Sequence, residues 1–73
     1  MRQANTRRTD SLMRGVERDA EDLRALPLRM LAGFAQAGSL AARLALTQIR
    51  DLDVSADRRV EAIRWLTVLN KGQ

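Results

Sequence analysis

The chain of 73 residues contains no cysteine, no histidine and no tyrosine. The absence of cysteine excludes disulfides, thiolate nucleophiles and sulfur-ligated metals, and the absence of histidine removes the commonest general base and metal ligand. Carboxylates, one lysine and a few hydroxyls are the groups left for acid–base or covalent chemistry. A chain this short also has difficulty in forming a cleft of roughly 300 Å³ or more. We therefore predict that the protein is not an enzyme and holds neither a metal nor a cofactor.

Long apolar runs are also absent. The longest uncharged run, Met30 to Ala42, has 13 residues, whereas a membrane-spanning helix needs about 20. The opening Met1 to Asp10 is polar and leads into no apolar segment of the kind found in signal peptides. Together with the lack of cysteine, this composition favours a cytoplasmic protein without a membrane span.

The positive charge is unevenly distributed along the chain. The formal net charge is +4, of which residues 1–9 carry +3, residues 10–24 carry −2, residues 25–50 carry +3, and residues 51–73 sum to zero. No acidic residue occurs between positions 25 and 50. A basic excess of this kind favours an acidic partner surface, which can belong to nucleic acid, membrane or protein.

The first half of the chain divides into an arm and a helix. Residues 1–9 show no apolar periodicity, and we expect a flexible arm there, before a single helical domain over residues 10–73. From Leu12 to Leu26 apolar residues recur at steps of three and four, which predicts a helix with one apolar stripe. Pro27 interrupts this helix and suits the first position of the next one.

The stretch from Pro27 to Leu52 is almost entirely apolar or small, which is typical of helices buried on most sides. Its polar positions keep a helical phase across Gly38-Ser39, and this favours one continuous helix. The same dipeptide combines a helix-ending glycine with an N-capping serine. We predict a break here.

The last helix is expected from Ala56 to Asn70, with Ser55 or Asp53 as its cap. Apolar residues cover more than half of its circumference. The expected main face is Ala56, Val60, Ile63 and Thr67, widened by Ala62, Leu66 and Leu69. The sequence thus predicts an all-α fold, a small bundle of three or four short helices with a flexible basic N-terminal arm.

Basic residues are the first candidates for partner binding. In the arm, Arg2, Arg7 and Arg8 either pair with phosphates or an acidic groove, or stay solvated without a function. Further along, polar residues recur at intervals of seven and would form one narrow line on a continuous helix. This line consists of Arg29, Gln36, Arg43 and Arg50.

The polar line has two interpretations. It is either a docking strip on which each arginine offers a planar fork to a carboxylate or phosphate, or only the solvated side of a helix. Because no acid separates Arg43 from Arg50, we expect neither to have a local ion-pair partner.

The apolar surface is wider than a small core can cover, so part of it is expected to meet another protein or a second copy of the chain. Trp65 is the only tryptophan and is the natural anchor of such an interface. A tryptophan packed inside the monomer is an equally good interpretation of the same residue.

A helix-turn-helix is an alternative. The segment Leu52-Asp53-Val54-Ser55 is similar to the Leu-Gly-Val-Ser turn of DNA-binding repressors, and a basic helix with Arg58 and Arg59 follows it. Asp53 replaces the usual turn glycine, however, and Ile49 stands where a small residue is required. Arg58 and Arg59 therefore complete the partner-binding candidates without establishing DNA as the partner.

The opening Ala4-Asn5-Thr6-Arg7-Arg8 is similar to the arginine-rich openings of phage antitermination proteins. In its size, its lack of cysteine and its basic arm, the chain resembles the small regulators that phages make to bind host RNA polymerase. This resemblance implies an RNA polymerase partner and no catalysis, and it assigns no role to a particular residue.

These observations predict a non-catalytic regulatory protein that binds a larger macromolecular partner, most readily the transcription machinery, to inhibit or redirect it. Nucleic acid is a secondary partner in this prediction. The first alternative is a self-assembling helical adaptor or structural protein, in which the surplus apolar surface forms a homodimer. The second is a DNA-binding repressor.

Overall fold

The structure is a computed structural model, and it describes residues 14–72. Residues 14–23 are helical, and three further helices follow: α2 (Leu28–Gln36), α3 (Leu40–Leu52) and α4 (Ala56–Lys71). No strand occurs within the described residues. The predicted all-α bundle of short helices is confirmed, whereas the predicted arm over residues 1–9 lies outside the part of the chain that the structure describes.

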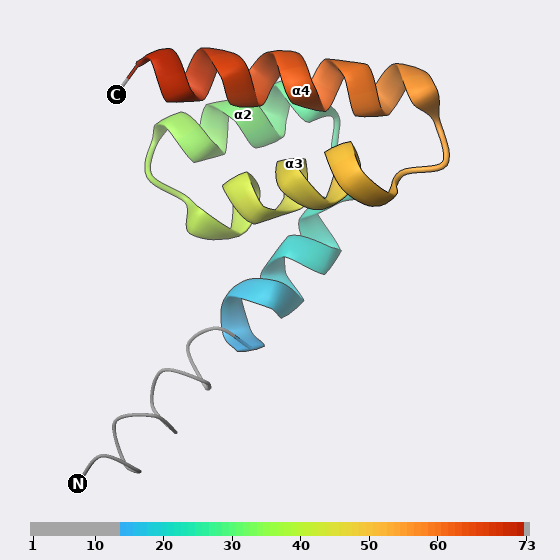
Figure 1. The fold of residues 1–73 in the computed structure, drawn as a ribbon. Helices are drawn as coiled ribbons and strands as arrows, with labels where there is room; N and C mark the ends of the chain where they lie inside the picture. Colours follow the sequence, from blue (N-terminus) through green and yellow to red (C-terminus); the bar gives the residue numbers. More distant parts are fainter. Residues whose placement is uncertain (1–13, 73) are drawn as a thin grey trace, which may run out of the picture.

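The three C-terminal helices pack against one another, and α3 runs in the opposite direction to α2 and α4 (Figure 1). The helical segment 14–23 extends from the side of α3 that lies away from α4 (Figure 1). Ala20 of this segment is fully buried, and Leu23 packs against the core. As a result, α3 is the central helix, with neighbours on two opposite sides.

Local signals fix where α2 ends and α3 begins. Gly38 has a φ of +106°, a conformation that glycine adopts without steric cost. The next residue, Ser39, caps α3 by accepting a hydrogen bond from the Ala42 N–H at 3.1 Å. The predicted break at Gly38-Ser39 is therefore confirmed. Pro27 precedes the first residue of α2 instead of being that residue, because its ψ of 142° is not helical.

The core within residues 14–72 is small. Its three largest fully buried side chains are Leu31, Leu46 and Ile49. The buried apolar residues are Ala20, Leu28, Leu31, Ala32, Ala35, Ala42, Ala45, Leu46, Ile49, Ala62, Leu66 and Leu69. Half of these are alanines, which allow the helices to approach closely but contribute little buried area. A core of this size stabilises a domain by roughly 3–5 kcal/mol.

The inward side of α4 differs from the expected main face. Ala62, Leu66 and Leu69 are buried, whereas Val60 and Ile63 are each 47% exposed. The sequence pattern allowed both sets to face inward, because apolar residues surround most of this helix. Packing against α2 and α3 buries the face of Ala62, Leu66 and Leu69, which was expected only to extend the main face.

Candidate protein-binding surfaces

The predicted polar line does not exist as one strip. Arg29 and Gln36 lie on α2, whereas Arg43 and Arg50 lie on α3, which runs the other way. The seven-residue interval aligns side chains only while one helix continues, and the chain reverses at Gly38. Gln36 and Arg43 still line one shallow hollow of about 200 Å³ at the end of the bundle.

Arg50 has an ion-pair partner, contrary to the prediction. Its Nε donates to Asp51 Oδ1 at 2.8 Å and its Nη2 donates to Asp51 Oδ2 at 3.1 Å. The hydrogen bond from Arg50 holds the pKa of Asp51 below its ordinary value, and the same bond raises the pKa of Arg50. The neighbouring acid was visible in the sequence at the next position. Much of the charge of Arg50 is therefore balanced locally.

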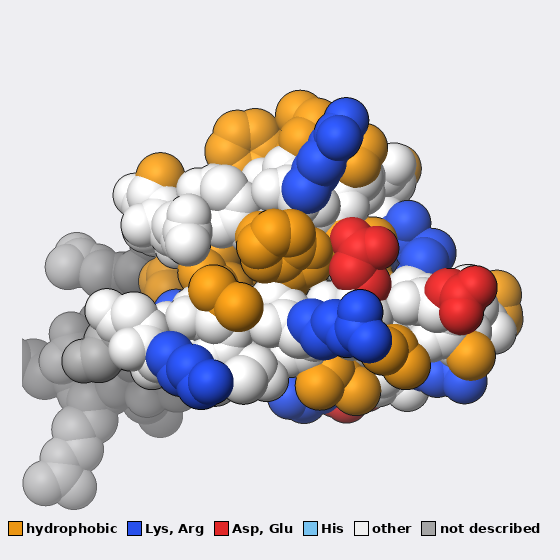
Figure 2. Space-filling model, turned by 90° about the horizontal axis from the view of Figure 1, so that it is seen from above, with side chains coloured by type: hydrophobic (Ala, Val, Ile, Leu, Met, Phe, Trp, Pro, Cys, Tyr) orange, Lys and Arg blue, Asp and Glu red, His pale blue; other side chains and the backbone are white. Residues whose placement is uncertain are grey.

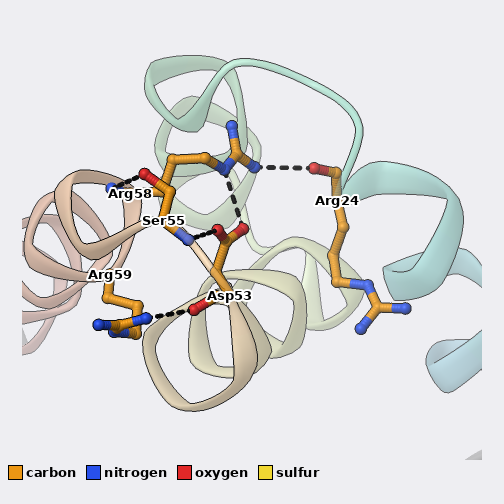
Figure 3. Close-up of polar contacts among 5 residues, drawn as sticks. All are labelled: Arg24, Asp53, Ser55, Arg58 and Arg59. Atoms are coloured by element: carbon orange, nitrogen blue, oxygen red, sulfur yellow. Dashed lines mark hydrogen bonds and ion pairs between the residues drawn. The ribbon is translucent and has the colours of Figure 1, made fainter.

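Arg58 links three parts of the chain (Figure 3). Its Nε donates to Asp53 Oδ2 at 3.0 Å, and its Nη2 donates to the backbone carbonyl of Arg24 at 3.0 Å. Asp53 Oδ1 accepts a hydrogen bond from the Ser55 N–H at 2.8 Å, and Arg59 donates to the Asp53 carbonyl. The bond from Ser55, followed by that from Arg58, holds the pKa of Asp53 below its ordinary value.

This Asp53 network gives Arg58 and Arg59 structural roles. Ser55, one of the two residues predicted as the cap, caps α4 by accepting a hydrogen bond from the Arg58 N–H. The helices α3 and α4 lie along each other in opposite directions (Figure 1), whereas the helices of a helix-turn-helix cross at about 90–120°. The arginines expected to reach DNA are instead engaged within the chain, which weighs against the repressor alternative.

Trp65 combines the two roles considered for it. Its side chain packs against the core, and its Nε1 donates to Glu61 Oε2 at 3.3 Å. It also lines an open hollow of about 430 Å³ with Glu61, Arg64 and Val68. The face over α2 and α4 carries apolar side chains interspersed with charges of both signs (Figure 2). This hollow has no excess of one charge.

A more apolar hollow lies between segment 14–23 and α3. Its volume is about 330 Å³, and the described residues that line it are Val16, Leu40, Arg43, Leu44 and Thr47. We name this hollow the α3 groove. Leu40 is 69% exposed, so an apolar side chain is presented to solvent at one end of the groove.

Among the residues that the structure describes, Arg43 is the only charged one that lines the α3 groove. Its Nη1 donates to Asn70 Oδ1 at 3.3 Å in an exposed contact. Within residues 14–72 it makes no ion pair, so its charge remains available to an incoming acidic group. Of the arginines predicted on α3, Arg43 is therefore the one placed beside an apolar surface.

Sequence reasoning missed the other members of the groove. Val16, Leu40, Leu44 and Thr47 lie on two helices that are separated in the sequence by α2. The sequence did show that α3 is apolar on nearly every side. This pattern predicted a buried helix but did not identify which side stays exposed to solvent.

Arg2, Arg7 and Arg8 lie outside the described residues, and Arg29 is exposed on α2. No group of three or more potential metal ligands occurs within residues 14–72. Among the same residues, no helix has both the length and the hydropathy that crossing a bilayer requires. No protein-family model, curated protein or solved structure matches the chain.

Proposed function

We propose that this chain is a non-catalytic regulatory protein that acts in the cytoplasm by binding a larger protein of the transcription machinery through the α3 groove. The observation that carries the proposal is the groove itself, an apolar hollow of about 330 Å³ in which Arg43 is the single charged residue among the described lining residues. Surfaces of this composition suit the apolar anchors of a protein partner.

The charge of the groove specifies the chemistry of the partner segment. Arg43 offers a planar guanidinium that matches a carboxylate in two hydrogen bonds. On the α3 side of the groove, residues 25–50 contain no acid that would repel such a carboxylate. The groove therefore fits a segment with one or two apolar side chains followed by an aspartate or glutamate.

RNA polymerase is the proposed partner because of the resemblance to small phage regulators in size, composition and basic opening. A regulator of this kind needs no catalytic group, which agrees with a chain that lacks histidine, cysteine and tyrosine. It acts by occupying a surface of the polymerase that transcription requires.

The test uses purified bacterial RNA polymerase and the fluorescently labelled chain. Leu40→Asp places an acid in the groove but also in the first turn of α3, where the helix dipole favours it, so the fold should persist. We expect its affinity for the polymerase to fall at least about tenfold. Val54→Asp is the matched control, because Val54 is 98% exposed in the turn before α4 and lies outside the groove.

A second pair of variants tests the charge. Arg43→Glu should weaken binding, with the largest loss at low salt, because it replaces an attraction by a repulsion. Arg29→Glu changes the net charge by the same amount at an exposed position of α2, outside the groove, and should leave binding nearly unchanged. If the polymerase does not bind the native chain, the choice of partner is wrong. If it binds both groove variants as tightly as the native chain, the choice of surface is wrong.

A further inference from the structure

The outward side of α2 carries an apolar strip, and the polar Arg29 and Gln36 are exposed beside it. Buried residues of this helix are Leu28, Leu31, Ala32 and Ala35. On the opposite side, four exposed residues follow the helical spacing of three, four and seven positions. They are Met30, Gly33, Phe34 and Ala37. We name these four residues the α2 ridge.

The α2 ridge contains no charge, and its two large side chains are half-exposed. Met30 and Phe34 each have 43% of their surface accessible. A contiguous exposed apolar strip on a helix is one of the features that mark a protein–protein contact surface. The ridge shares no residue with the α3 groove, so its role is independent of the proposed function.

The ridge alternates large and small residues in a way that is complementary to itself. In chain order it reads large, small, large, small: methionine at 30, glycine at 33, phenylalanine at 34 and alanine at 37. If two copies cross in opposite directions with a twofold axis between positions 33 and 34, Met30 faces Ala37 of the second copy. Phe34 then faces its Gly33. Each large side chain thus meets a small one, which is the arrangement that close packing favours.

The charge distribution also favours a second copy of the chain as the occupant. Two molecules of net charge +4 repel each other, and self-association is favoured where the contact surface itself is neutral. The α2 ridge is such a surface.

The space above Gly33 is open. A Cβ atom added at this position has no neighbour within 4 Å. In the monomer the glycine is therefore not required by packing, although it weakens an exposed helix by about 1 kcal/mol relative to alanine. In the antiparallel pair it provides the gap into which Phe34 of the second copy fits.

We propose that the protein forms a symmetric homodimer in which the α2 ridges of two copies pack in opposite directions around Gly33. The ridge spans seven residue steps, or about 11 Å, and buries less than the roughly 800 Å² per partner of a standard interface. The dimer is accordingly weak and depends on protein concentration. It leaves both α3 grooves uncovered.

Sedimentation equilibrium of the full chain over about 10–500 µM tests the dimer. Gly33→Glu improves helix propensity and has open space in the monomer, yet it fills the gap and places two like charges at the contact. We expect its dimer dissociation constant to rise at least about tenfold. Gly15→Glu is the matched control, because Gly15 is also helical, exposed and without a neighbour within 4 Å. Equal dimerisation of the two variants, or a native chain that stays monomeric, would overturn the proposal.

Cysteine cross-linking tests the orientation, because the native chain contains no cysteine. A mixture of Met30→Cys and Ala37→Cys should form the mixed disulfide faster than either variant links to itself. Gly15→Cys gives the rate of random collision. Faster self-linking at 30 and at 37 would indicate parallel ridges, and linking no faster than with Gly15→Cys would exclude contact. Either result contradicts the proposed dimer.

Discussion

The helices α2 and α3 come from one stretch of sequence with the same apolar composition, yet they are buried to different extents in the fold. Both are rich in leucine and alanine and neither contains an acid before Asp51. α3 packs between the segment 14–23 on one side and α2 and α4 on the other. α2 packs against α3 and α4 and leaves Met30 and Phe34 half-exposed. Apolar composition therefore sets how much apolar surface each helix has. The position of the helix in the bundle decides which part of that surface is buried within the chain.

The contrast between the two helices should be largest for core truncations. Leu46→Ala in α3 removes a fully buried side chain and should cost about 2–5 kcal/mol, which approaches the whole stability of roughly 3–5 kcal/mol expected for so small a core. Phe34→Ala in α2 should cost about 1 kcal/mol or less, because much of this ring is already exposed and alanine favours the helix. Urea unfolding followed by circular dichroism measures both. Equal losses would mean that the half-exposed Phe34 contributes as much to stability as the fully buried Leu46.

Removal of the Arg58 side chain should have the next largest effect. Arg58→Ala breaks the hydrogen bonds to Asp53 and to the Arg24 carbonyl, and we expect a loss of about 1–3 kcal/mol because both bonds involve a charged donor. Arg64→Ala, an exposed arginine on the same helix, is the control. If the two variants unfold at the same urea concentration, Arg58 does not hold the C-terminal end of α3 to the end of the segment 14–23.

Two glycines of the α2 region should respond with opposite signs. Gly38→Ala forces a side chain into a φ of +106° and should cost about 1–2 kcal/mol. Gly33→Ala adds a methyl group into open space on a helix and should stabilise the monomer by up to about 1 kcal/mol. Thermal unfolding at low protein concentration, where dimers do not form, measures both. A stabilising Gly38→Ala would show that the reversal between α2 and α3 does not need glycine.

The smallest effect concerns pH. The folded-state pKa of Asp53 lies below its unfolded value of about 3.9. Its carboxylate therefore stabilises the fold above that pH, and this contribution is lost as the pH falls through the folded-state pKa. Asp53→Asn should reduce the fall in melting temperature between about pH 5 and pH 3.

Glu17→Gln is the control for the pH experiment, because it removes the same charge from the segment 14–23 and Glu17 takes no part in the hydrogen bonds of the Asp53 network. A pH profile that is as steep in Asp53→Asn as in Glu17→Gln would assign the acid sensitivity to other carboxylates.

The sequence by itself determined the helices and their ends. Ser39 and Ser55 cap α3 and α4 through bonds to residues three positions ahead, and Gly38 ends the helix before it. These signals act within a few residues, so they can be recognised without knowledge of the fold. Trp65 and Arg43 were also identified from the sequence as residues of interest, and the structure places each beside a surface hollow.

Only the tertiary structure decided which apolar sides are covered and which basic residues remain available. The bond from Arg58 to the Arg24 carbonyl joins positions 34 residues apart, and the α3 groove brings Val16 next to Leu40 and Leu44. Helical periodicity gives the direction of each side chain about the axis of its helix. It does not give the rotation of one helix relative to the next. Where apolar residues surround most of a helix, as in α4, several rotations satisfy the sequence pattern. Close packing of alanines and leucines in the small core selects one of them.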